Sequence, residues 1–409
     1  MQKVTLSYNK GEINVDVPDS WSVKTVKKTA PPLTREKIRE CVLNPVGSLR
    51  LRDIAIKLDT NNARVALIFE DHTRFTPLAD AMEIVLEELN AAGIKDEQIF
   101  LIGASATHRA ATRKDIESKL GGAVSNRLKI IEHHCRNEAS LKYVGDTSFG
   151  NKIFLNKEVA ESDLIVGVGG IAPHGSVQFG GGAKLLLPGV AGFETIKYNH
   201  TSIDQSLSFQ GNEIRPMRRD MEEALKLVPY RFNVSGLIDH GLNLVDMVAG
   251  DPIEAHRAGM KKATALYHTT VEKCADVVFA CSHPFDVDCF QSVKGILPAL
   301  PFAKRRGVII WLSACPEGIG THQLTQIEDS YRLNMNRMLS EICEKTRVFF
   351  AAPSLKYEEV RPFLAPEIVF FDSADKAVGE AVRNSPQNAD AVVLYASPLT
   401  VGVQEQGRR

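Results

Sequence analysis

The fold is decided by residues 64–103, RVALIFEDHTRFTPLADAMEIVLEELNAAGIKDEQIFLIG. The stretch opens on a short apolar run, 64–69, and closes on another, 98–103, and each is typical of a buried β-strand. Between them, residues 78–92 place apolar side chains at helical spacing, and Gly93 follows as a helix-ending residue. A strand, a helix and a second strand in this order predict a parallel sheet covered by helices on both faces.

The same rhythm extends in both directions along the chain. Residues 3–16 alternate around a Lys-Gly turn as in a β-hairpin, and the run at 163–168 adds a strand to the first sheet. A polar stretch, 213–270, is expected to be helical. Beyond it, further strand candidates separated by helical segments lie at 276–281, 307–312, 347–351, 367–371 and 390–395.

We therefore predict an α/β protein of two domains, 1–270 and 271–409, each with a mainly parallel sheet flanked by helices. Thr34 is the expected N-cap of a helix that runs to about Val42.

Composition excludes several classes of protein. Lys and Arg number 49 and Asp and Glu 50, so the net charge of -1 argues against a nucleic-acid binder. The small basic clusters at 218–219 and 304–306 are expected to be solvated surface. No apolar run approaches the ~20 residues of a membrane helix, and the N-terminus lacks the pattern of a secretory signal. Seven scattered cysteines without a CxxC pair favour a reduced, cytoplasmic protein.

Polar loops follow three of the predicted strands. These loops, 70–77, 104–109 and 169–175, all carry histidine, and the first two also carry arginine. Because the carboxyl ends of parallel strands share one edge of a sheet, the loops predict a ligand site at that edge.

The segment 167–192 contains nine of the 29 glycines of the chain. Glycine lets the backbone approach a ligand closely, so this density indicates a bound group held by many backbone contacts, such as a phosphate. A set of tight turns is the simpler alternative. Lys184 within it suits a covalently attached pyridine cofactor. Residues 167–172 also match the dinucleotide fingerprint G-x-G-x-x-A, but Pro173 and the glycines that follow disfavour the helix that it requires.

Three histidines, His108, His174 and His200, lie in or near these loops and favour acid/base chemistry or metal binding. The neighbours His133 and His134 would point to opposite faces of a strand, so we interpret them as structural.

In the C-terminal half, Gln291 and Lys294 share one face of a predicted helix and could line a site. A solvated helix face explains the same spacing.

Together these motifs resemble the lactate racemase family, whose members use a nickel-pincer nucleotide. The glycine–lysine–proline block is the most specific of them. In chain order the motifs are DHTRFTP (71–77), SATHR (105–109), GIAPHG (170–175), FGGGAKLLLPGVAG (179–192), Asn199-His200 and QSVKG (291–295).

The resemblance implies a pyridinium mononucleotide whose two sulfur atoms and one ring carbon hold nickel. Lys184 would be joined to it through a thioamide, and His200 would be the protein ligand of the metal. Other residues implied to contact the cofactor are Asp71, Thr73, Gly180, Gly181 and Gly182.

The implied substrate is a 2-hydroxy acid bound in a cleft between the domains. His108 and His174 would act as acid and base on its two sides, while Arg74 and Lys294 would hold its carboxylate. Gln291 and Phe290 would line the same pocket. Phe290 stands where lactate racemases carry tyrosine, so lactate is a candidate substrate and a larger or more polar 2-hydroxy acid is another.

The implied reaction is racemisation or epimerisation at the α-carbon. A histidine takes the hydroxyl proton while a hydride leaves for the cofactor, and the hydride returns to the other face of the 2-oxo acid. Other partners would be the proteins that synthesise the cofactor and insert nickel. Two alternatives stay open: a nicotinamide-dependent oxidoreductase, and a hydroxy-acid-binding protein without catalytic activity.

Overall fold

The computed structural model describes residues 1–203 and 213–404, which form two compact units. Residues 30–265 make up one of them, here called the inserted unit. Residues 1–29 join the chain from Leu266 onward in the other, here called the terminal unit.

This division differs from the expected domains, 1–270 and 271–409, mainly at the N-terminus. The chain enters the terminal unit for the second time at Leu266, close to the expected boundary. The first 29 residues belong there as well, because strand β3 (Ser22–Val26) pairs in parallel with β19 (Asp390–Leu394).

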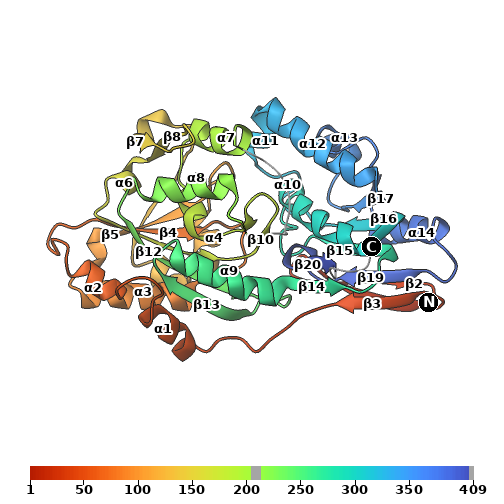
Figure 1. The fold of residues 1–409 in the computed structure, drawn as a ribbon, viewed down its shortest axis with the longest axis horizontal. Helices are drawn as coiled ribbons and strands as arrows, with labels where there is room; N and C mark the ends of the chain where they lie inside the picture. Colours follow the sequence, from red (N-terminus) through yellow and green to blue (C-terminus); the bar gives the residue numbers. More distant parts are fainter. Residues whose placement is uncertain (204–212, 405–409) are drawn as a thin grey trace. The chain divides into compact units, whose positions relative to one another are not determined.

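The inserted unit contains a six-stranded sheet that is parallel except at one edge (Figure 1). The predicted strands at 64–69, 98–103 and 163–168 are confirmed, as is the mainly parallel α/β fold. In spatial order the strands are β13 (Leu244–Gly250), β12 (Tyr230–Ile238), β9 (Leu164–Gly170), β4 (Val65–Glu70), β5 (Ile99–Ala104) and β6 (Lys129–Ile131).

Helices bury one face of this sheet. In β4, Val65, Leu67 and Phe69 pack with these helices, while Ala66 and Ile68 are buried on the other side, as expected for a strand covered on both faces. The helices are α1 (Arg35–Leu43), α2 (Leu51–Ala55), α3 (Ala79–Ala91), α4 (Arg113–Leu120) and α5 (Gly122–Ser125). The hydroxyl of Thr34 caps α1 as predicted, by accepting the N–H of Lys37.

The glycine-rich segment packs elsewhere on the sheet. Its short 3-10 helix η3 (Gly182–Leu185) contacts β4, β9 and β12, and α8 (Pro216–Leu225) contacts η3. The other elements of this unit are α6 (Lys157–Ala160), α7 (Phe193–Thr201), α9 (Glu254–Tyr267) and the hairpins β7 (Leu141–Asp146)–β8 (Lys152–Asn156) and β10 (Pro173–His174)–β11 (Gln178–Phe179).

The prediction that 213–270 is helical is wrong for its middle, which forms β12 and β13. The sequence did not predict β12 as a strand because the strand contains buried polar residues. The hydroxyl of Tyr230 donates to Oδ1 of Asn233 at 2.8 Å, and Nδ2 of Asn233 donates to Oγ of Ser235 at 2.7 Å. Because these groups satisfy one another, they lie inside the protein although the sequence resembles a surface segment.

The terminal unit contains a parallel six-stranded sheet (Figure 1). All five strands predicted in the C-terminal half are confirmed. In order they are β18 (Val369–Phe371), β17 (Arg347–Ala351), β16 (Ala303–Leu312), β15 (Ala275–Cys281), β19 and β3.

Both faces of this sheet are also covered. The predicted N-terminal hairpin, β1 (Gln2–Tyr8) and β2 (Gly11–Val17), packs with α14 (Ala374–Arg383) on one face. On the other face, Trp311 stacks on Phe350 in a core that includes α12 (Asp329–Cys343) and η5 (Leu297–Phe302). Strands β14 (His268–Val271) and β20 (Val401–Gln404) form a separate pair.

Within the described ranges, none of the helices combines the length and the apolar character that crossing a bilayer would require.

We predict that the stability of the inserted unit depends on pH through His133. This side chain is buried and its Nε2 donates to the carbonyl of Ala191 at 3.0 Å. Burial lowers its pKa from the usual 6.5 to about 4. Below pH 6.5 the unfolded chain therefore binds the proton first, and the free energy of unfolding should fall until about pH 4 by up to ~1.4 kcal/mol per pH unit.

Urea unfolding at pH 7 and pH 5, followed by circular dichroism, measures this effect. His133→Gln should make the pH dependence shallower, because the buried His200 and His256 still contribute to it. His134→Gln, at an exposed position that contacts Glu132, should change it less. An identical pH dependence in both variants would contradict the prediction.

Candidate active site

A buried carboxylate connects the loops that leave β4 and β9. Glu70, the last residue of β4, accepts the N–H of Gly170 at 2.7 Å and that of Thr76 at 3.1 Å. The Nζ atom of Lys119, itself nearly buried, donates to the same carboxylate at 2.8 Å. A buried charge that is paired and fully hydrogen-bonded is stable, so the two loops are held in register. Sequence reasoning missed both members of this ion pair; the position of Glu70 directly after the apolar run was the available signal.

Asp71 and His108 form a hydrogen-bonded pair. Oδ2 of Asp71 lies 2.5 Å from Nδ1 of His108, and both side chains are largely buried. Because a carboxylate can only accept, Nδ1 carries the ring proton and Nε2 carries the lone pair. Burial alone would raise the pKa of Asp71, but the adjacent His108 and Arg74 lower it well below the usual range. This is the arrangement of a histidine base oriented by a carboxylate.

Thr73 connects this pair to Arg74. Its N–H and its hydroxyl donate to Oδ1 of Asp71 at 3.2 and 2.7 Å. Its hydroxyl oxygen accepts from Nη1 of Arg74 at 2.8 Å. The half-buried guanidinium is thus anchored beside the Asp71–His108 pair, and its planar fork matches a carboxylate or a phosphate.

Glycine is required at two positions of the triplet 180–182, here called the glycine loop. Gly181 and Gly182 have φ angles of +76° and +58°. A Cβ atom on Gly181 would lie 2.3 Å from the carbonyl oxygen of Gly170, and one on Gly182 would lie 2.8 Å from the ring of His256. A methyl group fits at Gly180. Tight turns therefore account for two of the three glycines, and the loop is rigid.

Lys184 lies in η3, directly after this loop. Burial lowers the pKa of its amine well below the usual value, and the charges of Arg218 and Arg74 lower it further. An uncharged amine is a nucleophile and loses no ionic stabilisation when it is acylated. Lys184 therefore has the chemistry of a lysine that carries a covalent group.

His200 lies on α7 with one ring nitrogen committed to the backbone. Nδ1 is 3.1 Å from the carbonyl oxygen of Ile196, so Nδ1 carries the proton and Nε2 the lone pair. Burial, together with Lys184 and His108, lowers the pKa of His200 to about 3. A neutral ring with a fixed tautomer is the usual state of a histidine that binds a metal.

No group of three or more His, Cys, Asp or Glu side chains in the described ranges is arranged to hold a metal ion.

His174 presents the opposite tautomer. It ends β10, in the hairpin that leads into the glycine loop, and its Nδ1 accepts the N–H of Ser176 at 3.3 Å. The neutral ring therefore carries its proton on Nε2. His108 thus presents a basic nitrogen and His174 an acidic N–H.

The hairpin also bears on the dinucleotide interpretation of residues 167–172. That fingerprint needs a helix to open immediately after the strand, and here β10 and β11 follow β9 instead. The local structure therefore does not favour a nicotinamide nucleotide in this segment.

The expectation that the basic cluster at 218–219 is solvated surface is wrong for Arg218. Its side chain is 2% exposed. The guanidinium donates to the carbonyl of Gly181 at 2.9 Å and to that of Phe179. Charged residues are rarely buried, so the sequence favoured the wrong environment; the position of Arg218 beside Met217 on α8 was the only signal.

In the terminal unit, Gln291 and Lys294 contact each other, as their spacing predicted. They lie on α10 (Cys289–Ser292) and η4 (Val293–Gly295), and Nζ of Lys294 donates to Oε1 of Gln291. The same ammonium lies 5.0 Å from the ring centroid of Phe285. The carboxylate of Asp288 caps α10 by accepting the N–H of Gln291 at 2.7 Å.

Phe290 is buried among aromatic side chains. Its ring meets that of Phe363 edge-on, with centroids 5.0 Å apart, and lies 5.9 Å from the ring of His322. The surroundings of Phe290 are therefore aromatic on at least these two sides.

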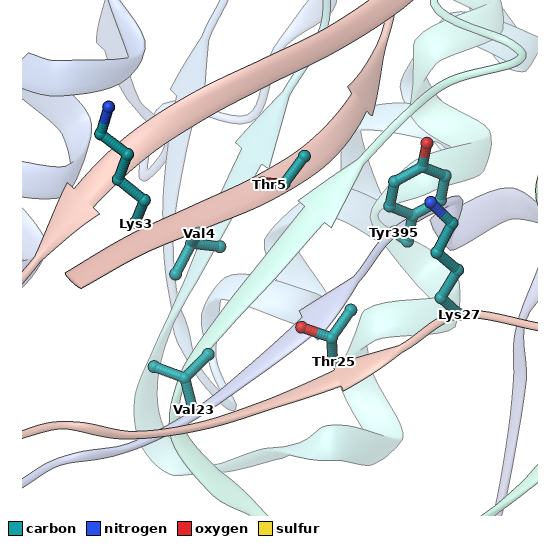
Figure 2. Close-up of a pocket in the computed structure, with 7 residues that line it drawn as sticks. All are labelled: Lys3, Val4, Thr5, Val23, Thr25, Lys27 and Tyr395. Atoms are coloured by element: carbon teal, nitrogen blue, oxygen red, sulfur yellow. The ribbon is translucent and has the colours of Figure 1, made fainter.

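A pocket in the terminal unit contains none of the predicted site residues (Figure 2). Figure 2 shows Lys27 beside Tyr395, with its Nζ 3.7 Å from the ring centroid. The Tyr395 hydroxyl donates to the exposed Glu12, so its polar group is already used. The lining residues are Lys3, Val4, Thr5, Val23, Thr25, Lys27 and Tyr395.

Comparisons with known proteins agree with the motifs. A family model described as "Lactate racemase N-terminal domain" matches residues 8–211. A lactate racemase from Thermoanaerobacterium thermosaccharolyticum is 29% identical over 330 residues, covering 78% of this chain and 76% of the relative. A lactate racemase from Lactiplantibacillus plantarum is 27% identical over 343 residues, covering 80% of each chain.

Solved structures share the fold. The lactate racemase apoprotein from T. thermosaccharolyticum matches with a TM-score of 0.81 at 23% identity, over 98% of this chain and all of that one. A Thermotoga maritima protein matches with a TM-score of 0.66 at 17% identity, over 93% of this chain and all of that one. These matches show that the chain is an isomerase of the lactate racemase family.

Proposed function

We propose that the protein inverts the α-carbon of a 2-hydroxy acid with the help of a nickel-pincer nucleotide attached to Lys184. One observation carries the proposal: Lys184, a buried amine with a lowered pKa, and His108, oriented by Asp71, both lower the pKa of His200, whose tautomer is fixed. The relatives named lactate racemase support the same reaction type.

The residues present suit this cofactor. Lys184 would carry it, and Nε2 of His200 would bind its nickel, since imidazole nitrogen is a good nickel ligand. The positive charges of Arg218 and Arg74 beside Lys184 favour a group that bears a phosphate. The other proposed contacts of the cofactor are Gly180, Gly181, Gly182, Asp71 and Thr73. When bound, such a group supplies a hydride acceptor.

The two histidines divide the proton transfers. Nε2 of His108, which carries the lone pair, accepts the hydroxyl proton of one enantiomer, and Asp71 stabilises the resulting imidazolium. Nε2–H of His174 donates the proton to the oxygen when the product alcohol forms. For the other enantiomer the roles exchange, so each histidine acts as the base for one enantiomer of the substrate.

The substrate carboxylate is proposed to bind Arg74, with Lys294 and Gln291 as further substrate-binding residues. A guanidinium binds a carboxylate through two parallel hydrogen bonds, which orient the substrate as well as attract it. Phe290, which lacks a hydroxyl, favours a substrate other than lactate. The proteins that synthesise the cofactor and insert nickel are the other proposed partners.

Protein produced together with the cofactor-synthesis proteins should carry added mass on the peptide that contains Lys184. Lys184→Arg keeps a long basic side chain but cannot form the bond, so this variant should contain no adduct and no activity. Intact mass and peptide mapping measure the result, with Lys197→Arg as the matched control that stays loaded. Full activity with an unmodified Lys184 would end the hypothesis.

Asp71→Asn should lower kcat of the loaded protein about 10²–10⁴-fold, because His108 loses both its tautomer and its counter-charge. Asp115→Asn makes the same chemical change where the carboxylate contacts Arg109 and Thr112, and should alter kcat less than about threefold. Steady-state racemisation assays compare the two. Equal effects would show that Asp71 has no special relation to the base.

Arg74→Gln should raise KM about 10–100-fold, since a charge-assisted hydrogen bond contributes ~1.5–3 kcal/mol. A panel of lactate, malate, aromatic hydroxy acids and aldonic acids, followed by loss of optical purity, identifies the substrate. Alcohols that lack a carboxylate should not compete. Arg113→Gln, which removes an exposed guanidinium bonded to Asn126, is the control. An unchanged KM in Arg74→Gln would remove this residue from the carboxylate site.

A further inference from the structure

Helix α8 carries two buried, oppositely charged residues that the reaction does not use. Arg218 is 2% exposed and Asp220 is 0% exposed. Residues two apart on an α-helix point about 200° from each other, so their side chains leave opposite sides of α8. One side contacts the glycine loop through η3, and the other contacts α7.

On the first side, the peptide carbonyls of three consecutive residues are held. Arg218 donates to the carbonyls of Phe179 and Gly181. Between them, the carbonyl of Gly180 accepts from Nε2 of His256 on α9 at 2.8 Å. The loop that precedes Lys184 is therefore fixed by side chains from outside it.

On the second side, Asp220 accepts three hydrogen bonds from side chains. The hydroxyl of Thr147 donates at 2.5 Å, and Nδ2 of Asn151 at 2.8 Å. Nδ2 of Asn199 donates at 2.6 Å, and Asn199 directly precedes His200 on α7. Asp220 thus holds the helix that presents His200.

We propose that α8 sets the position of Lys184 relative to His200, with Arg218 and Asp220 as the positioning residues at its two contacts. The inference rests on the proposed function, in which Lys184 carries the cofactor and His200 binds its metal. A covalent bond and a metal bond to one small molecule can form together only if the two side chains are correctly spaced. A hydrogen-bonded helix is a rigid spacer for this purpose.

The cost of burying these charges supports a specific role. In the part of the chain that the structure describes, no salt bridge reaches Arg218 or Asp220, and Nε of Arg218 has no hydrogen-bond partner. Burial lowers the pKa of Arg218, and the charge of Glu222 on the same helix opposes this shift only in part. A buried charge without a salt bridge is destabilising, and apolar side chains would pack α8 without that penalty. These two side chains therefore hold their neighbours through directional hydrogen bonds and not through salt bridges.

The test begins with the apoprotein of three variants on the same helix. Arg218→Lys keeps the charge but removes the guanidinium that donates to two carbonyls at once. Asp220→Asn replaces one acceptor oxygen with an N–H₂ group, which cannot accept from the neighbouring donors. Arg219→Lys is the matched control, because Arg219 is exposed on the same helix and its Nε donates to the carbonyl of Ile214 at 3.2 Å. Hydrogen exchange measured by mass spectrometry should be at least fivefold faster at residues 179–186 in Arg218→Lys and at 193–201 in Asp220→Asn. Arg219→Lys should match the parent in both segments.

Protein that carries the cofactor distinguishes the effect of the Arg218 contact from that of the Asp220 contact. Arg218→Lys should lower the fraction of chains with an adduct on Lys184 at least fivefold. Asp220→Asn should keep that fraction within twofold but lower nickel per adduct at least threefold. Circular dichroism confirms folding, and if one variant does not fold, the other decides.

Parent-like exchange in both segments, or equal loosening of both segments by either variant, would overturn the inference. The absence of an adduct on Lys184 in the parent protein would instead overturn the proposed function. The exchange data on the apoprotein would still decide the role of α8, so the two failures are distinguishable.

Discussion

The active site of the inserted unit depends on the carboxylate of Glu70. Parallel strands β4 and β9 end at the same edge of the sheet, but their loops would be independent without a link. Glu70 supplies it by accepting backbone N–H groups from both loops while Lys119 balances its charge. Asp71 follows Glu70 directly, so fixing one carboxylate also fixes the next, and through it His108. The position of His108, the proposed base, thus depends on a residue outside the Asp71–His108 pair.

Electrostatics gives the site its chemical selectivity. The positive charges of Arg74 and Arg218 both act on Lys184, whereas the nearby carboxylates, Glu70 and Asp71, already have partners. Such a site favours anions, and both the phosphate of a mononucleotide and the carboxylate of a hydroxy acid are anions. Burial lowers the pKa of both Lys184 and His200, which favours the neutral forms that their proposed roles as nucleophile and metal ligand require.

The sequence predicted what depends on local pattern and failed where distant groups decide. Apolar runs such as 64–69 identified the strands because they are buried on both faces. Strand β12 was missed because Asn233 and Ser235 are buried together, which no local pattern reveals. The loops with His108, His174 and Lys184 were found by their place after strands and glycines. The burial of Arg218 was not, because it depends on carbonyls 37 and 39 residues away.

The early position of β3 has a consequence for synthesis of the protein. Its partner β19 is synthesised much later, so β3 waits roughly 20–70 s at about 5–20 residues per second. During that time the inserted unit, which is continuous in sequence, can fold completely. The nascent chain then exposes an unpaired strand and an apolar hairpin face, which are open to aggregation. Chaperone demand should therefore be highest late in translation and come from the terminal unit.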